Sequence, residues 1–210
     1  MYEIRFGGMH DFRQKMYRVL CDSVFQEHVS TDAVILEIGT GDGEFINNIN
    51  ALDKFAVDIR ISNYLNEDVT FVQTPSTDLR FAGNNLFDVV FASNLFEHLT
   101  REEIDQTIVE MRRVLKDRGK FLILQPSFPY CYKDYFRFAD HVTPVDHRAL
   151  IELLELSRFE IKSVKRLLPY STKSRFPKSL FLLKLYLRLP LVKRVFGKQV
   201  FIVAEVDKSD

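Results

Sequence analysis

The stretch "VILEIGTGDGEFI", residues 34–46, places three glycines within five positions, directly after an apolar run that contains one carboxylate, Glu37. The run "AVILEI" (33–38) predicts a buried strand, and "EFINNIN" (44–50) predicts a helix. Gly43 would let that helix pack closely against its neighbours. We therefore expect a strand, a glycine turn and a helix in succession, with the turn at the carboxyl edge of a sheet.

A second carboxylate, Asp58, ends the next predicted strand, "KFAVDI" (54–59), 21 residues after Glu37. Gly39 and Gly41 permit backbone angles closed to other residues and leave no side chain in a ligand's way. A carboxylate at the tip of the second strand can accept two hydrogen bonds from a ribose diol. The spacing differs from the Gly-x-Gly-x-x-Gly pattern that binds a pyrophosphate, and no lysine follows the turn as in triphosphate sites. A ligand with a ribose and no phosphates fits better; the alternative is a tight turn that binds nothing.

Further segments alternate between strand and helix patterns. Apolar runs predict strands at 69–74, 87–93, 120–127, 158–168 and 199–206, and helical spacing occurs at 11–28, 101–116 and 144–157. Residues 117–119 read as the stop of the middle helix. Such alternation predicts an α/β fold, a parallel sheet with helices on both faces.

The composition indicates a soluble globular protein, because 46% of the 210 residues are apolar and 28% are charged. Cys21 and Cys131 are far apart and no Cys/His ligand spacing occurs, so we expect reduced thiols and no structural zinc. No signal-peptide pattern and no apolar run long enough to span a bilayer is evident. The expected location is the cytoplasm.

Five motifs occur in order: "EIGTGDG", "VDI", "STDLRF", "FDVVFASNLFEHL" and "VEMRRVLKDRGKFLILQPS". With them, residues 30–166 resemble the class I S-adenosylmethionine-dependent methyltransferases. The resemblance implies a Rossmann-like, doubly wound sheet of seven strands, mostly parallel with an antiparallel last strand. It also implies S-adenosyl-L-methionine as cofactor and methyl transfer as the reaction.

The resemblance further implies roles for single residues. Its cofactor-binding positions are Glu37, Ile38, Gly39, Thr40, Gly41, Gly43, Asp58, Ile59, Asp78, Leu79, Asn94 and Leu95. Residues 37–43 would line the methionine part, Asp58 would hold the ribose, and Ile59 would flank the adenine. Asp78 and Leu79 would contact the adenine edge, although "TDL" also suits a simple turn. Asn94 would lie beneath the cofactor, with Leu95 packing on it.

A hydroxyl acceptor needs its proton removed near the transition state. His98 and His141 follow the fourth and fifth predicted strands, and histidine has a suitable pKa of about 6.5. Either could instead be structural, and His141 could cap the helix that begins near Pro144. The aromatic residues of 128–138 could stack on a sugar, cover the cofactor or seal the sheet edge. No clustered acids suggest a metal site, so we expect no metal.

Residues 161–204 contain eleven lysines and arginines and no acidic residue. Within them, 171–198 lies between the last two strands and is too long for a plain connection. Lys184 and Arg188 interrupt an apolar run, as in helices that lie at a membrane interface. The alternatives for this segment are part of an acceptor pocket, a dimer contact or an RNA site. The aromatic residues argue against the RNA site, because they are not interleaved as in a base-stacking surface.

We expect a single domain over 1–210. Its parts are an N-terminal helical segment (1–30), a cofactor-binding core (31–168), a helical insertion (169–198) and a last strand (199–206). Residues 91–99 and 122–161, with the basic segment before the last strand, look closest to bacterial methyltransferases associated with surface polysaccharide or lipid-linked glycan assembly. Our main hypothesis is methyl transfer to an oxygen of a small molecule or glycan. The alternatives are a non-catalytic cofactor-binding or membrane-associated partner and a nucleic-acid or protein methyltransferase. "SNLF" (93–96) replaces the Asn-Pro-Pro-Tyr type of motif, which argues against methylation of planar exocyclic or amide nitrogens but does not fix oxygen as the target.

Overall fold

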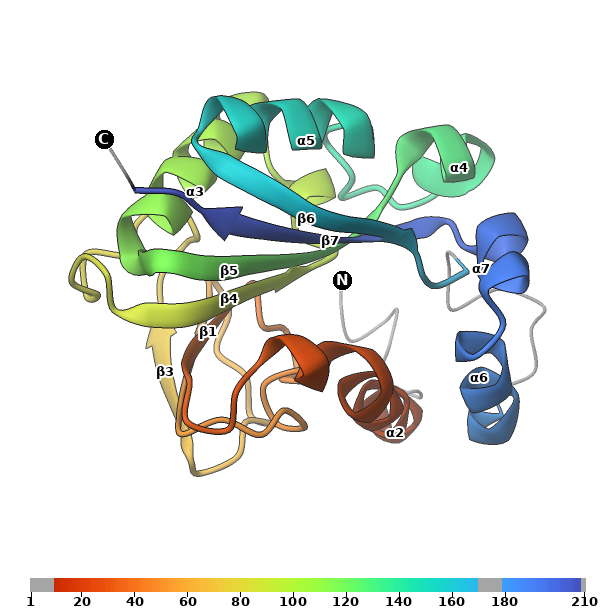
Figure 1. Cartoon of the computed structure of the whole chain (residues 1–210), viewed down its shortest axis with the longest axis horizontal. Helices are drawn as coiled ribbons and strands as arrows, with labels where there is room; N and C mark the ends of the chain where they lie inside the picture. The colour runs from red at the N-terminus through yellow and green to blue at the C-terminus, as the bar shows by residue number, and fades with distance from the viewer. Residues whose placement is uncertain (1–9, 170–178, 209–210) are drawn as a thin grey trace.

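The computed structural model describes residues 10–169 and 179–208. Its strands form one seven-stranded sheet in the order β3-β2-β1-β4-β5-β7-β6 (Figure 1). They are β1 (Val34–Ile38), β2 (Asp53–Asp58), β3 (Val69–Gln73), β4 (Phe87–Ser93), β5 (Leu115–Pro126), β6 (Phe159–Arg166) and β7 (Gln199–Val206). Only β7 runs antiparallel to its neighbours, β5 and β6. The predicted α/β fold, with its mostly parallel sheet and antiparallel last strand, is confirmed.

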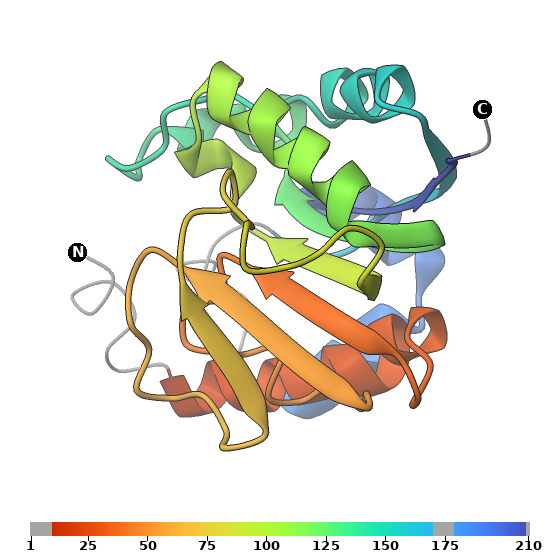
Figure 2. The ribbon, with the colours of Figure 1, turned by 90° about the vertical axis from the view of Figure 1, so that its left-hand side faces the viewer.

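Helices cover both faces of the sheet, as Figures 1 and 2 show. They are α2 (His10–Leu20), the π-helical η1 (Cys21–Phe25), the 3₁₀ helices η2 (Gln26–His28) and η3 (Phe96–His98), α3 (Arg101–Val114), α4 (Phe128–Tyr135), α5 (His147–Leu156), α6 (Leu180–Leu187) and α7 (Pro190–Phe196). α3 and α5 pack on one face, and α2 and α6 on the other. The helix predicted over 11–28 therefore exists as three successive helical types.

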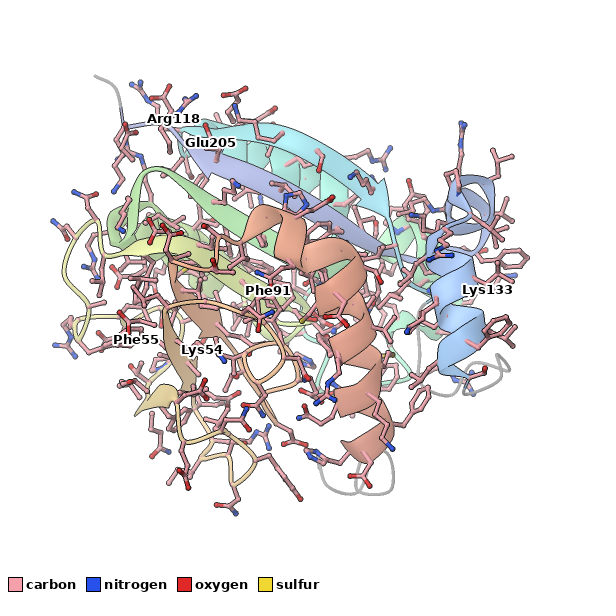
Figure 3. All side chains as sticks on the ribbon, turned by 60° about the horizontal axis from the view of Figure 1, so that its bottom comes forward. Lys54, Phe55, Phe91, Arg118, Lys133 and Glu205 are labelled. Atoms are coloured by element: carbon pink, nitrogen blue, oxygen red, sulfur yellow. The ribbon has the colours of Figure 1, made fainter. Side chains whose placement is uncertain are left out.

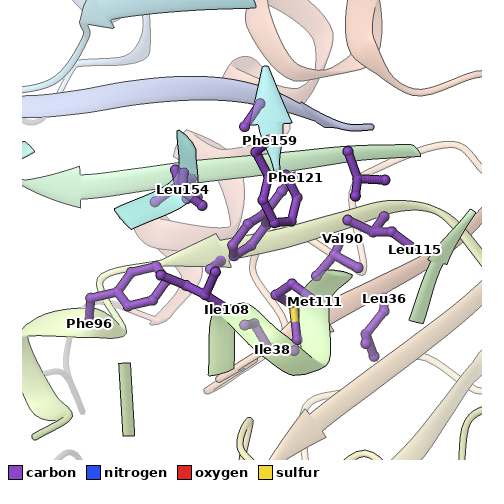
Figure 4. Packing of buried hydrophobic residues seen from close by; sticks show 14 of the residues in the cluster. Leu36, Ile38, Val90, Phe96, Ile108, Met111, Leu115, Phe121, Leu154 and Phe159 are labelled. Carbon is purple, nitrogen blue, oxygen red and sulfur yellow. The ribbon is translucent and has the colours of Figure 1, made fainter. Parts of the chain in front are cut away.

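Two apolar cores result, one on each face. Phe96, Phe121 and Phe159 follow one another in the core beneath α3 and α5, with ring centroids 6.3 and 6.1 Å apart (Figure 4). On the other face Phe45 stacks on Phe91 at 3.7 Å, and Phe91 lies beside α2 (Figure 3). These rings hold the sheet in place between its helices.

α3 begins with a capping box, because Thr100 and Glu103 exchange side-chain and backbone hydrogen bonds of 2.8 and 3.3 Å. The helix ends at Val114, two residues before the predicted end, and residues 117–119 are not its stop. They form an irregularity inside β5, where the pairing register with β4 shifts and Arg118 has φ +60°. Arg118 is anchored there by Glu205 of β7, with 2.9 Å between Nε and Oε1 (Figure 3).

The helix predicted over 44–50 is wrong: these residues form successive turns. Asn47 N donates to Gly43 O at 3.0 Å, but Asn48 N donates to Phe45 O at 2.9 Å, which mixes four- and three-residue spacings. The Asn48 side chain also donates to the Glu44 carbonyl. Asparagine side chains compete in this way with helical hydrogen bonds, so the apolar periodicity persists without a regular helix.

The insertion between β6 and β7 contains α6 and α7, and its predicted first part, 171–178, lies outside the described residues. Pro190 begins α7 and separates it from α6, as its fixed φ predicts. Leu183 and Leu187 pack against the core beneath α2. Within the described ranges, we find no helix that is both long and apolar enough to cross a membrane.

Candidate functional site

The glycine turn closes over the end of β2. Gly39 N and Thr40 N both donate to the Val57 carbonyl, at 2.8 and 3.1 Å. Gly39, Gly41 and Gly43 have φ of +66°, +55° and +72°, the left-handed region that other residues rarely adopt. A Cβ on Gly39 would lie 2.9 Å from Leu95 Cδ1. The turn therefore needs glycine for its backbone angles and, at Gly39, also for space.

Glu37 supports this turn from below. It is 3% exposed, and its Oε2 accepts hydrogen bonds from Thr40 Oγ1 at 2.8 Å and from Ile46 N at 3.1 Å. Burial raises the pKa of the Glu37 carboxyl well above its usual range. Ile38 and Thr40 are also buried. These three side chains shape the floor of the predicted methionine region.

Asp58 links the turn to the end of β2. Its Oδ2 accepts a hydrogen bond from Gly41 N at 2.9 Å, and its Oδ1 accepts one from Arg60 N at 2.8 Å. Each carboxylate oxygen has a second lone pair, so Asp58 keeps acceptor capacity for a ribose diol. Ile59, directly after it, is 69% exposed. The structure thus brings the predicted ribose and adenine positions next to the glycine turn.

Beyond β3 lies a hollow of about 460 Å³, lined by Val72, Gln73, Thr74, Asp78, Arg80 and Phe81. Asp78 lines it with a carboxylate that pairs with Arg80 through hydrogen bonds of 2.8 and 2.6 Å, which hold the pKa of Asp78 below its usual range. Leu79 does not face the hollow. It is fully buried in the core, and its N donates to Glu110 Oε2 at 2.8 Å. The Leu79 side chain therefore packs in the core, and its predicted adenine contact stays a prediction.

Asn94 and Leu95 join several elements at the carboxyl end of β4. Asn94 has φ +50°, and its Oδ1 accepts a hydrogen bond of 2.5 Å from Gln199 Nε2 at the start of β7. Ser93 Oγ accepts a hydrogen bond from the Asn94 side-chain amide and lies 2.8 Å from the Tyr17 hydroxyl of α2. Leu95 reaches the glycine turn at Gly39. The two predicted residues thus lie beside the turn, with contacts to α2 and β7.

The two candidate histidines meet, although they are 43 positions apart in the chain. The rings of His98 and His141 have centroids 5.1 Å apart and are nearly perpendicular. His98 Nδ1 lies 2.9 Å from the Asp140 carbonyl oxygen. The N-cap of α5 is Asp146, whose Oδ1 accepts a hydrogen bond from Arg148 N at 3.0 Å, so His141 does not cap this helix.

Glu97 joins these histidines and was missed by sequence reasoning. It is 2% exposed, and its Oε2 accepts a hydrogen bond from Gln125 Nε2 at 2.8 Å. Burial raises the pKa of the Glu97 carboxyl. Its backbone carbonyl accepts from Val142 N at 2.7 Å, which ties the segment after α4 to η3. The Glu-His dipeptide after β4 was the available signal, but its burial and its partner segment depend on the tertiary structure.

The aromatic segment 128–138 divides into buried and exposed rings. Tyr135 is fully buried, and its hydroxyl donates to Thr143 O at 2.8 Å and accepts from Val145 N at 3.1 Å. Tyr132 and Phe136 are 57% and 56% exposed. Tyr135 therefore helps to seal the sheet edge, whereas Tyr132 and Phe136 are available to a ligand.

Comparisons with known proteins agree with this geometry. Residues 36–123 match a family model described as a methyltransferase domain. The chain is 30% identical over 101 residues to the ubiquinone/menaquinone biosynthesis C-methyltransferase UbiE of Blochmanniella pennsylvanica (strain BPEN). That match covers 47% of this chain and 39% of the relative, so the chain spans less than half of the length of that curated protein.

Solved structures share the fold over nearly the whole chain. A SAM-dependent methyltransferase from Archaeoglobus fulgidus superimposes with a TM-score of 0.72 at 18% identity, covering 95% of this chain and 98% of that one. The 1,6-didemethyltoxoflavin-N1-methyltransferase of Burkholderia thailandensis, solved with S-adenosylhomocysteine, gives 0.60 at 15% identity, covering 94% and 79%. The chain therefore has the class I methyltransferase fold, and its residues 36–123 are similar to a methyltransferase domain.

Proposed function

We propose that this protein transfers a methyl group from S-adenosylmethionine to an oxygen of a small molecule or glycan. The observation that carries the proposal is the junction of the glycine turn with Asp58, whose carboxylate accepts from Gly41 N and retains acceptor capacity beside the exposed Ile59. The match of 36–123 to a methyltransferase domain supports the same cofactor. The predicted cofactor positions keep their roles in this proposal.

The cofactor is already activated, because its methyl carbon is bonded to a positively charged sulfur. The protein has to align the acceptor oxygen, the methyl carbon and the sulfur in a line, with the reacting atoms about 3–3.5 Å apart. As the carbon–oxygen bond forms, the carbon–sulfur bond breaks and sulfur keeps the electron pair. His98 or His141 would accept the hydroxyl proton. Exposed Tyr132 and Phe136 would stack on an apolar sugar face.

The test combines binding with turnover. Calorimetric titration with S-adenosylhomocysteine should show one site, and S-adenosylmethionine with a labelled methyl group should transfer the label to polar or lipid-linked glycan extracts. Absence of binding would refute the proposal. Binding without transfer to any glycan, nucleic-acid or protein acceptor would favour the alternative, a non-catalytic cofactor-binding partner.

We also propose that α6 and α7 contact an anionic membrane surface. Large apolar side chains on them are between 41% and 76% exposed: Phe181, Leu182, Leu185, Leu189, Leu191, Val195 and Phe196. Lys184, Arg188, Lys193 and Arg194 lie among them, and no described acidic side chain is within 4.0 Å of these four cations. Apolar side chains with interspersed cations suit a headgroup boundary. This surface adjoins α4 at the end of the sheet where β5 ends (Figure 1), so the acceptor could be membrane-linked.

Vesicle flotation tests this contact. Anionic phosphatidylglycerol vesicles should bind the protein more strongly than neutral phosphatidylcholine vesicles, and Phe181→Ser with Leu191→Ser should abolish binding. Leu156→Ser is the matched control, because Leu156 is 77% exposed on α5, away from this surface. Equal binding by the double variant and the control would reject the membrane contact.

A further inference from the structure

Glu97, His98 and His141 each offer one ligand atom, and these three atoms lie within 4.8 Å of one another. Glu97 and His98 come from η3, which follows Asn94 and Leu95, and His141 comes from the segment after α4. The cluster therefore stands beside the predicted methionine end of the cofactor. This is where an acceptor must approach.

The carboxylate of this cluster is buried without a cationic partner. Glu97 is 2% exposed, and no lysine or arginine in the described parts of the chain has a nitrogen within 4.0 Å of it. Buried carboxylates are ordinarily paired with a cation or coordinate a metal. The two neighbouring imidazoles are ligands of the kind that, together with a carboxylate, hold a metal ion.

Contacts around the cluster hold these side chains in place. In the tautomer that donates from Nδ1 to the Asp140 carbonyl at 2.9 Å, His98 keeps the Nε2 lone pair for a ligand bond. The His141 ring lies between Phe138 and Tyr135, with centroids 5.1 and 4.8 Å away. Such support is what metal ligands require from their surroundings.

Gln125 supplies a second, independent observation. It is fully buried, and its Nε2 donates to Glu97 Oε2 at 2.8 Å. Its Oε1 is also buried and has no hydrogen-bond donor among the residues that the structure describes. A buried amide oxygen without a donor costs free energy, and a metal-bound water beside Glu97 would supply one.

We propose that Glu97, His98 and His141 bind a divalent first-row transition metal, such as Zn²⁺, Mn²⁺ or Fe²⁺, at the acceptor side of the site. Two nitrogens and one carboxylate favour these ions over Mg²⁺ and Ca²⁺, which prefer oxygen ligands. Three protein ligands leave a coordination position for water or for an acceptor oxygen. Sequence reasoning missed this site because its ligands come from two distant segments, and the proposal departs from the expectation of no metal.

This inference deepens the proposed function and rests on it for the identity of the acceptor. An acceptor hydroxyl bound to the cation would release its proton to water, and its oxygen would then attack the methyl carbon while the carbon–sulfur bond breaks. The two histidines would then serve as ligands and not as the base. Acceptors with a second oxygen adjacent to the hydroxyl, such as sugar diols, would chelate the ion.

The test measures metal binding directly. Protein stripped with a chelator is titrated calorimetrically with Zn²⁺ and Mn²⁺, and Co²⁺ is added while its visible absorption is recorded. We expect one equivalent to bind, and His98→Gln and His141→Gln each to weaken binding about tenfold or more. His28→Gln is the matched control, because His28 contacts Glu27 and lies outside the cluster. Melting temperatures establish that each variant is folded.

Absence of saturable metal binding to the wild-type chain would overturn the site. Wild-type metal affinity in both cluster variants, or a loss of affinity confined to His28→Gln, would overturn it too. Titration of the stripped protein with S-adenosylhomocysteine separates this result from the proposed function. Cofactor binding without metal binding removes the metal site alone, whereas absence of cofactor binding removes the proposed function.

Discussion

The proposed cofactor side and the proposed acceptor side of the site are built in different ways. On the cofactor side, Glu37, the glycine turn and Asp58 come from one stretch of 22 residues and are held by hydrogen bonds to nearby backbone atoms. On the acceptor side, η3 meets the distant segment 128–143 only through tertiary contacts, such as that between the Glu97 carbonyl and Val142 N. Local construction makes a site recognisable in sequence, whereas the acceptor side depends on the whole fold.

The largest expected effect tests how firmly the cofactor side is fixed. Phe45 follows the glycine turn, is fully buried and stacks on Phe91 at 3.7 Å. Phe45→Ala should lower the free energy of unfolding by about 3–5 kcal/mol, because it removes this contact and leaves a cavity. Urea denaturation measures the loss.

Phe136→Ala is the counterpart on the acceptor side. Phe136 is 56% exposed, so its truncation should cost under about 1 kcal/mol. Equal losses of unfolding free energy in Phe45→Ala and Phe136→Ala would mean that the cofactor side and the acceptor side are equally stable, which would contradict the comparison.

Asp58→Ala should weaken binding of S-adenosylhomocysteine about 100-fold, which is ~3 kcal/mol, because hydrogen bonds from the ribose to a charged acceptor are lost. Calorimetry measures the affinity. Asp53→Ala, at the opposite end of β2, is the matched control and should bind like the wild type. Unchanged affinity in Asp58→Ala would remove the ribose assignment.

A smaller effect concerns pH. Burial raises the pKa of Glu37, so the folded protein holds this proton to a higher pH than the unfolded chain, whose glutamates titrate near about 4.3. The contribution of Glu37 to stability is therefore full below that pH and is lost as the pH rises toward the folded-state pKa. Glu37→Gln should show a shallower fall of stability between about pH 5 and 8 in urea denaturation.

Glu67→Gln serves as the control for that pH series, because Glu67 is exposed. It should leave the slope unchanged. The opposite outcome is a wild-type stability that rises from pH 5 to 8, with no such rise in Glu37→Gln. It would show that the folded state favours the ionised form of Glu37.

The smallest effect compares the two thiols. Cys21 and Cys131 are both buried and free, and burial raises the pKa of Cys131 to about 12. Both should react slowly with a thiol reagent at pH 8 until the protein unfolds. Cys131 should react before Cys21, since α4 is short and non-helical at Cys131. Peptide mapping identifies the labelled residue; labelling of Cys21 first would reverse the expected order of local opening.

Sequence reasoning located all seven strands because each is an apolar run next to turn residues, and for the same reason it placed Asp58 correctly at the end of β2. It failed at 44–50, where asparagine side chains compete with helical hydrogen bonds. It could not foresee that the Leu79 side chain lies in the core, since a residue beside a site looks the same in sequence whether it points to the core or to the ligand. The cluster of Glu97 with His98 and His141 depends on how the segment after α4 folds back on η3, and no local pattern encodes that return.

The position of β7 has a consequence for how the chain assembles. β7 follows all the other strands in sequence but lies between β5 and β6, with hydrogen bonds to both. During synthesis, β6 therefore has no strand to pair with until residues 199–206 have left the ribosome. The same event delivers Gln199 to Asn94 beside the glycine turn. Completion of the sheet and completion of the ligand niche are thus one late step, and a nascent chain that stops short of it would acquire neither.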